Sequence, residues 1–225
     1  MRAVVQRVST AELVVEGDWK GQIGRGLVHV LSKNNEVHGL ARFGNAAVLE
    51  EVQKRAAKVW RMDMGVDRAT DLPKDFDVVL HMAVSWTGDD DINVQNRSFH
   101  LSCTFVGDLM YRMEKAVFVL GSTGSVYQAV KGFCSEDATP VQGGGTYVTA
   151  KIAMTQLARW LGATFGRKAA VLRFFWPYAP YIEHRRVAKL LEGKLMTGQP
   201  KAIHQRTYIK QHVENAIAAA AHASE

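Results

Sequence analysis

Short apolar runs alternate along the chain with longer segments in which apolar side chains recur every three or four positions. The short runs are typical of strands and the longer spacing of amphipathic helices. Strands are predicted at 12–16, 36–42, 58–63, 76–83, 115–122 and 169–175. Helices are predicted at 23–33, 45–57, 89–113 (for the most part), 147–164, 184–192 and 210–222. This alternation, with strands as continuously apolar as "VFVL", predicts a parallel sheet that helices cover on both faces.

One domain accounts for the whole chain. With 225 residues, 47% of them hydrophobic, the chain can bury one full-sized core. We therefore expect a single doubly wound α/β domain over residues 1–225. Residues 1–10 precede the first predicted strand, and we expect them to form an extra edge segment or a recombined leader.

Composition narrows the classes of function. No apolar run approaches the ~20 residues that span a bilayer, and the first residues, "MRAVVQRVST", lack the apolar core of a secretory signal. Two cysteines are too few for a disulfide framework, which favours the cytoplasm. The eight histidines show no metal-ligand spacing, so no metal site is expected.

Positive charge is concentrated in one stretch. The formal net charge is +6, and residues 183–210 carry seven basic side chains against two acidic ones. Two interpretations stay open for this stretch: an ordinary solvated surface, or a site for a phosphorylated ligand or RNA. Nucleic acid is the less favoured partner, and a small-molecule substrate is expected.

In doubly wound sheets, ligands bind at the carboxyl ends of the strands. Gly21 and Gly24 lie at the start of the first predicted helix, where glycines let the backbone approach a pyrophosphate. Arg42 follows the second predicted strand, where an acidic residue would favour NAD, and an arginine there favours NADP. Asp63 ends the third and could accept a hydrogen bond from an adenine amino group.

Hydroxyl, phenol and ammonium groups follow the later strands. Ser122 and Thr123 lie at the end of the strand predicted at 115–122. Tyr147 and Lys151 are four residues apart at the start of a predicted helix, so they share one face. Such a pair arises by chance often enough that its surroundings must decide its meaning.

The Tyr147 and Lys151 pair belongs to a series of six motifs that follow one another along the chain. They are "GQIGRGL" (21–27), "DVVLHMA" (77–83), Asn96, "GSTGSVY" (121–127), "YVTAK" (147–151) and "LRFFWPYAP" (172–180). With them, the chain from about residue 12 to 222 resembles the extended short-chain dehydrogenases/reductases, the NAD(P)-dependent epimerase/dehydratase group. The resemblance implies a Rossmann-type fold with NAD(P) as cofactor, and residues 177–210 as a reduced substrate-side segment.

The resemblance also implies roles for single residues. Tyr147 would be the catalytic base, Lys151 would activate it and hold the nicotinamide ribose, and Thr123 would bind the reacting oxygen. The cofactor would contact Gly21, Ile23, Gly24, Arg42, Asp63, Ala83 and Lys151. Ser122 and Asn96 would contact the substrate, which is expected to be a sugar nucleotide or a similar hydroxyl or carbonyl compound. A homodimer is possible.

Some positions depart from the family pattern. Asp18 replaces the first glycine of the phosphate loop, Gln128 replaces the glycine after "VY", and Trp176 and Ala179 replace Asn and Gly. The segment after residue 180 is also short for the family. These departures leave open a catalytically idle NAD(P)-binding protein. Residues 1–31 resemble the start of D-aminoacyl-tRNA deacylases, so a hydrolase of that type is a second alternative.

Overall fold

Six parallel strands form the central sheet of the computed structural model, in the order β3-β2-β1-β4-β5-β6. The strands are β1 (Arg2–Gln6), β2 (Glu36–Ala41), β3 (Lys58–Arg61), β4 (Val78–His81), β5 (Val117–Thr123) and β6 (Lys168–Phe174). The structure describes residues 2–6, 22–85, 91–127, 135, 136, 140, 144–174, 177, 178, 207, 208 and 218. The sheet reverses its direction of growth between β1 and β4. The predicted doubly wound, Rossmann-type fold is therefore confirmed.

The N-terminal strand differs from the sequence-based expectation. Arg2–Gln6 pairs in parallel with β2 on one side and with β4 on the other, so it lies at the centre of the sheet. The expectation of an extra edge segment at residues 1–10 is wrong for these five residues. The apolar run Ala3–Val5 suits a strand with neighbours on both sides, but a pattern alone does not say which strands will pair. The strand predicted at 12–16 lies outside the described residues.

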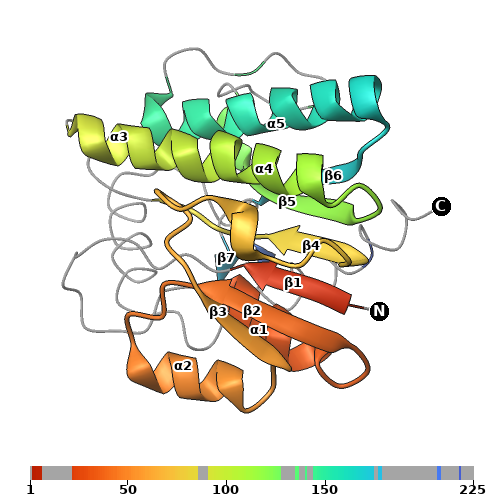
Figure 1. The fold of residues 1–225 in the computed structure, drawn as a ribbon. Helices are drawn as coiled ribbons and strands as arrows, with labels where there is room; N and C mark the ends of the chain where they lie inside the picture. Colours follow the sequence, from red (N-terminus) through yellow and green to blue (C-terminus); the bar gives the residue numbers. More distant parts are fainter. Residues whose placement is uncertain are drawn as a thin grey trace.

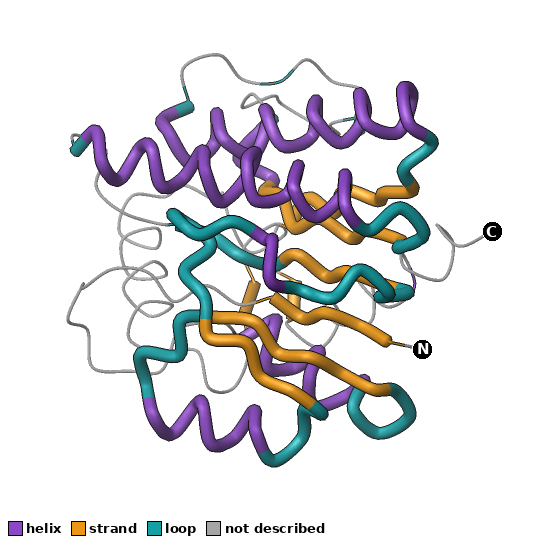
Figure 2. The backbone as a smooth tube through the Cα atoms, viewed as in Figure 1, coloured by secondary structure: helices purple, strands orange, loops and turns teal. Residues whose placement is uncertain are grey.

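Helices cover both faces of this sheet. They are α1 (Gln22–Leu31), α2 (Ala46–Gln53), α3 (Ile92–Phe99), α4 (Phe105–Arg112) and α5 (Gly145–Phe165). Figure 1 shows α3, α4 and α5 along one side of the sheet and α2 on the opposite side, and Figure 2 shows the strands enclosed between them. The ends of the helices carry ordinary signals: the Asn45 side chain caps α2, the Asp91 side chain caps α3, and Gly166 ends α5 at φ 65°.

A π-helical turn, η2 (His100–Thr104), joins α3 to α4. The predicted helical segment 89–113 is thus one nearly continuous rod with a single irregular turn. Such turns are rare and often occur at functional sites. Two short 3₁₀ turns, η1 (Ala69–Asp71) and η3 (Gly124–Val126), follow β3 and β5.

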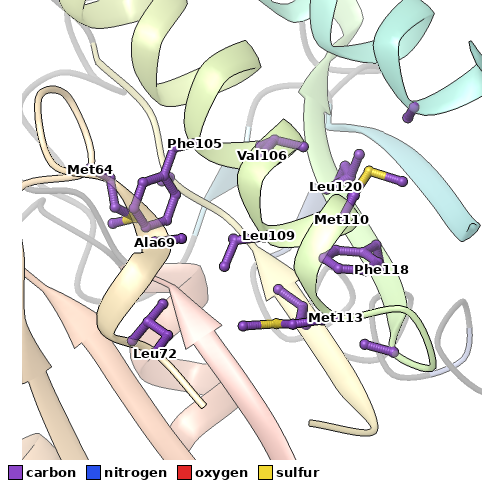
Figure 3. Close-up of a cluster of buried hydrophobic side chains, with 14 of the residues drawn as sticks. Met64, Ala69, Leu72, Phe105, Val106, Leu109, Met110, Met113, Phe118 and Leu120 are labelled. Atoms are coloured by element: carbon purple, nitrogen blue, oxygen red, sulfur yellow. The ribbon is translucent and has the colours of Figure 1, made fainter. Parts of the chain in front are cut away.

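Two clusters of buried apolar side chains hold the helices against the two faces of the sheet. The first lies between the sheet and the helices α4 and α5, and Figure 3 shows Met110 of α4 beside Leu120 of β5 and Phe105 of α4 beside Met64. The second joins α1 and α2 to the other face, through residues such as Leu27, Val48 and Val119. Because each face of the sheet packs against helices, the open part of the domain is its edge at the strand ends.

Beyond β6 the structure describes little of the chain. The two-residue strands β7 (Pro177–Tyr178) and β8 (Thr207–Tyr208) pair in parallel. The helices predicted at 184–192 and 210–222 lie outside the described residues, apart from Ala218, and most of the basic stretch 183–210 does too. Within the part that is described, no helix is both long and apolar enough to cross a membrane.

Candidate functional site

The carboxyl edge of the sheet collects most of the predicted site residues. Because all six strands are parallel, their ends meet at this one edge. Arg42 follows β2, Ala83 follows β4, and Ser122 and Thr123 end β5. The point at which strand order reverses, between β1 and β4, is where such folds place a ligand.

Tyr147 and Thr123 meet at this edge through a hydrogen bond between their side chains. Thr123 Oγ1 also accepts a hydrogen bond from the backbone N–H of Ser125 (3.2 Å), which holds the hydroxyl at the end of β5. Burial raises the pKa of Tyr147, and the hydrogen bond with Thr123 opposes that effect only in part. Burial outweighs the effect of the hydrogen bond from Thr123.

Lys151 lies one turn farther along α5 and is only 2% exposed. Its Nζ donates a hydrogen bond to the backbone carbonyl of Ala83 (2.9 Å), so it ties α5 to the end of β4. The Thr155 hydroxyl donates to the backbone carbonyl of Lys151 (2.9 Å). Burial lowers the pKa of Lys151 to about 8, and the Cys103 thiol opposes this shift. A buried ammonium with so low a pKa is typical of functional sites.

Two further titratable side chains lie around Lys151, and the sequence analysis did not single out either. His81 of β4 is fully buried, and burial together with the Lys151 charge lowers its pKa well below 6.5. Cys103 belongs to the π-helical turn η2, and its Sγ lies 4.0 Å from the carbonyl oxygen of Ala150. Burial raises the pKa of this thiol. A histidine inside the apolar run "VVLHMA" was the signal that could have drawn attention to the cluster.

Asp63 lies in an ionic network just after β3. Arg97 Nη2 donates to both of its carboxylate oxygens (2.8 and 2.7 Å), the backbone N–H of Gly65 donates to Oδ1 (3.0 Å), and Arg42 lies 3.8 Å away. Burial raises the pKa of Asp63, but these donors outweigh it, and the net shift is downward. Arg97, on α3, was not predicted as a site residue. The carboxylate keeps acceptor positions beyond those in use, because two oxygens offer about four.

The remaining predicted site residues lie in several different places. Gly21 lies outside the described residues, while Gly24 is buried in the first turn of α1 and Ile23 packs against the second apolar cluster. Asn96 is exposed on α3. Ser122 is 4% exposed, and its hydroxyl has no hydrogen-bond partner within the described part of the chain. Asp18, Gln128, Trp176 and Ala179 also lie outside that part.

A small pocket of about 110 Å³ lies on another flank of α5. Its lining includes Gln156 and Arg159 of α5 together with Arg173 of β6. The Arg173 guanidinium donates to the Tyr127 hydroxyl and to the carbonyl of Glu136 (2.6 Å). None of the predicted site residues that the structure describes lines this pocket. Nowhere in the described residues do three His, Cys, Asp or Glu side chains gather as a metal would require.

The sequence of this chain matches a known protein family. Residues 19–225 match the model of the NAD dependent epimerase/dehydratase family. The chain belongs to this family. No curated protein sequence matches the chain. The family match leaves out residues 1–18 and takes in the rest of the segment that resembles D-aminoacyl-tRNA deacylases.

Solved structures of epimerases and dehydratases have the same fold. A UDP-glucuronic acid 4-epimerase from Bacillus cereus in complex with NAD is 22% identical, with a TM-score of 0.71 over 97% of this chain and 73% of that one. A dTDP-glucose 4,6-dehydratase from Streptomyces venezuelae with NAD bound is 20% identical, with a TM-score of 0.70 over 98% and 72%. Pal from Bacillus thuringiensis is 21% identical, with a TM-score of 0.73 over 98% and 74%. At these identities the likeness establishes the epimerase/dehydratase fold alone.

Proposed function

We propose that this member of the epimerase/dehydratase family transfers hydride between NAD(P) and a carbon that bears a hydroxyl or carbonyl group, with Tyr147 as the base. The observation that carries this proposal is the hydrogen bond between Tyr147 and Thr123 at the carboxyl edge, one helical turn from the buried Lys151. A phenol, a second hydroxyl and an ammonium at one strand end are the groups that proton transfer to or from a substrate oxygen requires.

The residues along this edge fit a dinucleotide. Ala41 and Ala83 are small residues that are buried at the ends of β2 and β4. The first turn of α1, at Ile23 and Gly24, with Gly21 before it, would hold the pyrophosphate, because helix N-termini attract anions. Lys151 would hold the nicotinamide ribose next to Ala83. The dinucleotide, when bound, supplies the hydride acceptor or donor.

The chain itself moves the proton. Thr123 donates a hydrogen bond toward the phenol oxygen, which favours the phenolate, and it would also bind the reacting oxygen of the substrate. Tyr147 would take the proton of the substrate hydroxyl. Because burial keeps its pKa high, nearby positive charge is needed to make it a base at neutral pH, and Lys151 is the cation of the chain that lies one turn away.

NADP is the preferred dinucleotide in this proposal. Arg42 follows β2 and lies 3.8 Å from Asp63. In this proposal, the adenosine end of the dinucleotide would lie beside these two residues. A 2′-phosphate would find a positive charge there, and the Arg97 side chain next to Asp63 adds a second. Asp63 keeps its proposed role as an acceptor for the adenine amino group.

The substrate is proposed to be a sugar nucleotide, since the similar structures include enzymes that act on UDP-sugars and on dTDP-glucose. Ser122 and Asn96 stay candidates for substrate contact. A homodimer and a cytoplasmic location stay predictions. Tyr111 of α4 and Trp160 and Phe165 of α5 form an exposed aromatic group that a second copy could cover.

A catalytically idle dinucleotide-binding protein is the second candidate. The raised pKa of Tyr147 favours it, because a phenol that stays protonated takes no proton. The deacylase alternative is set aside, because the family match spans residues 19–225.

Three substitutions separate these candidates. Tyr147→Phe should abolish turnover and leave dinucleotide affinity nearly unchanged, because the phenol oxygen acts on the substrate. Lys151→Ala should impair both. Thr123→Ala should lower the rate by an intermediate factor, within the ~10²–10⁴-fold that acid–base positioning contributes. The measurements are dinucleotide affinity and the rate of hydride transfer with a panel of UDP- and dTDP-sugars.

Tyr111→Phe is the matched control, because Tyr111 is 62% exposed on α4. It should leave both quantities unchanged. If the wild-type chain binds a dinucleotide but transfers no hydride to any sugar nucleotide, the idle candidate is supported. If Tyr147→Phe retains full turnover, Tyr147 is not the base.

A further inference from the structure

The small pocket beside α5 brings polar and apolar groups together away from the proposed reaction site. Its volume is about 110 Å³. Because a water molecule takes up about 30 Å³ of the liquid, the pocket has room for roughly four water-sized groups. Ile152, Thr155, Gln156 and Arg159 line it from α5, and their spacing of three and four residues places them on one face of the helix. Arg173 lines it from β6.

The Arg173 guanidinium is held in place at the side of this pocket. Its Nη1 donates hydrogen bonds to the Tyr127 hydroxyl and to the backbone carbonyl of Glu136 (2.6 Å), and its Cζ lies 4.9 Å from the centre of the Tyr127 ring. Both bonds come from Nη1, so within the described residues the donors on Nη2 and Nε are not in use. A guanidinium carries more N–H donors than these two bonds need, and the others remain for a ligand.

The Arg159 guanidinium lies on the α5 side of the pocket and is exposed. No residue in the described part of the chain forms a hydrogen bond or an ion pair with it. Gln156, three residues earlier, adds the N–H donors of its amide. Thr155 adds no donor, because its hydroxyl already donates to the backbone carbonyl of Lys151 (2.9 Å). Donors for a ligand therefore come from two sides, α5 and β6.

The rest of the described lining is apolar, with one acidic exception. Val126, Pro140 and Ile152 contribute carbon surface, and Val126 is only 4% exposed. Glu136 is exposed and is the one carboxylate among the described lining residues. Two guanidinium charges against one carboxylate leave the lining net positive. Such a lining suits an anion that carries a short apolar chain better than a fully hydrated inorganic anion.

We propose that this pocket binds the carboxylate of a small aliphatic acid, which Arg159 and Arg173 hold from two sides, with the carbon chain against Val126, Pro140 and Ile152. Planar guanidinium groups form short, charge-assisted hydrogen bonds to carboxylates, so the donor set fits the ligand. None of the described residues that are proposed to bind the dinucleotide or to act in the reaction lines this pocket. The proposal therefore does not rest on the proposed function.

The test titrates the isotope-labelled full chain with propionate at pH 7 and constant ionic strength, and follows the backbone N–H signals of α5 and β6 by NMR. Saturable, millimolar binding is expected, because so few atoms make contact. Arg159→Gln should weaken it roughly tenfold or more, since a hydrogen bond to a charged group is lost. Because Arg159 is exposed, this change leaves the packing of α5 in place. Arg55→Gln, an exposed arginine that follows α2, is the matched control and should change nothing.

Glu136→Gln provides a test of opposite sign. Removal of the lone carboxylate from the lining should tighten propionate binding, because it removes a repulsion. Inorganic phosphate should bind more weakly than propionate, because it gains nothing from the apolar wall. A tightening in Glu136→Gln together with a loss in Arg159→Gln supports the proposal.

Several results would overturn it. They are the absence of saturable binding at tens of millimolar propionate, an unchanged affinity in Arg159→Gln, and an equal loss in Arg55→Gln. Phosphate that binds as tightly as propionate would overturn the choice of a carboxylate. If Arg42→Ala removes the binding and Arg159→Gln does not, the anion occupies the dinucleotide edge instead. No readout uses a dinucleotide or turnover, so failure of this proposal and failure of the proposed function can be told apart.

Discussion

Lys151 is the residue at which the proposed function and the stability of the fold oppose each other most clearly. The folded chain buries its ammonium with a carbonyl as direct acceptor, and its pKa falls from 10.5 to about 8. The unfolded chain therefore binds more protons than the folded one between these two values. Stability must rise with pH across that window, and below it the full cost of burial is present.

Lys151→Met should therefore stabilise the protein at pH 7. A shift of this size corresponds to a gain of roughly 3 kcal/mol, at about 1.4 kcal/mol per pKa unit. The gain should shrink as pH rises from 8 toward 10.5 and be nearly gone at the upper end. Urea unfolding at pH 7 and at pH 10 measures both values.

Lys33→Met is the control, because Lys33 is exposed after α1 and should give no such gain. A Lys151→Met variant that is no more stable than wild type at pH 7 contradicts the account. So does a gain that stays constant with pH.

The sequence motifs predicted some residues of the candidate site and missed others. Tyr147, Thr123 and Lys151 were predicted because each lies within a recognisable motif. Their hydrogen bonds could not be predicted, since the partner of Lys151 is the carbonyl of Ala83, a residue 68 positions away. His81 lies inside the motif "DVVLHMA" but was not singled out there, and Arg97 belongs to no motif. Only the folded chain brings the Lys151 charge to bear on His81 and pairs Arg97 with Asp63.

At the scale of elements, hydrophobic spacing predicted whether a segment is a helix or a strand better than it predicted which strands pair. The helices α1, α2 and α5 and the strands β2 to β6 lie where the pattern indicated. The place of Arg2–Gln6 in the sheet was missed, because strand pairing is a tertiary property. The π-helical turn η2 was missed as well, since one extra residue in a turn barely disturbs helical spacing over a short segment.

Gly39 shows how closely the strand β2 and the helix α2 pack. A Cβ at this position of β2 would lie 2.8 Å from Cγ1 of Val52, on α2. Gly39→Ala should force α2 away from the sheet and destabilise the protein by about 1–3 kcal/mol, the usual cost of overpacking. Gly44→Ala is the control, because nothing lies within 4 Å of a Cβ there. Thermal unfolding of both variants measures the difference, and equal stability of the two would mean that α2 packs less closely than described.

At the scale of the whole molecule, the doubly wound sheet explains why the residues of the proposed site lie at one edge. Helices bury both faces, so the parallel strands leave their carboxyl ends as the place where polar side chains converge. Thr123, Tyr147 and Lys151 occupy one part of this edge, and Arg42 and Asp63 lie after the neighbouring strands β2 and β3. The two groups suit the two ends of a dinucleotide.

Thermal unfolding with NADP and with NAD tests this account most directly. We expect both dinucleotides to raise the unfolding temperature, NADP at the lower concentration, with about 2.7 kcal/mol of added stability at 100 times Kd. Arg42→Ala should remove the advantage of NADP and leave protection by NAD in place. If NADP and NAD both leave the unfolding temperature unchanged at millimolar concentration, the proposed dinucleotide-dependent function of this edge is contradicted.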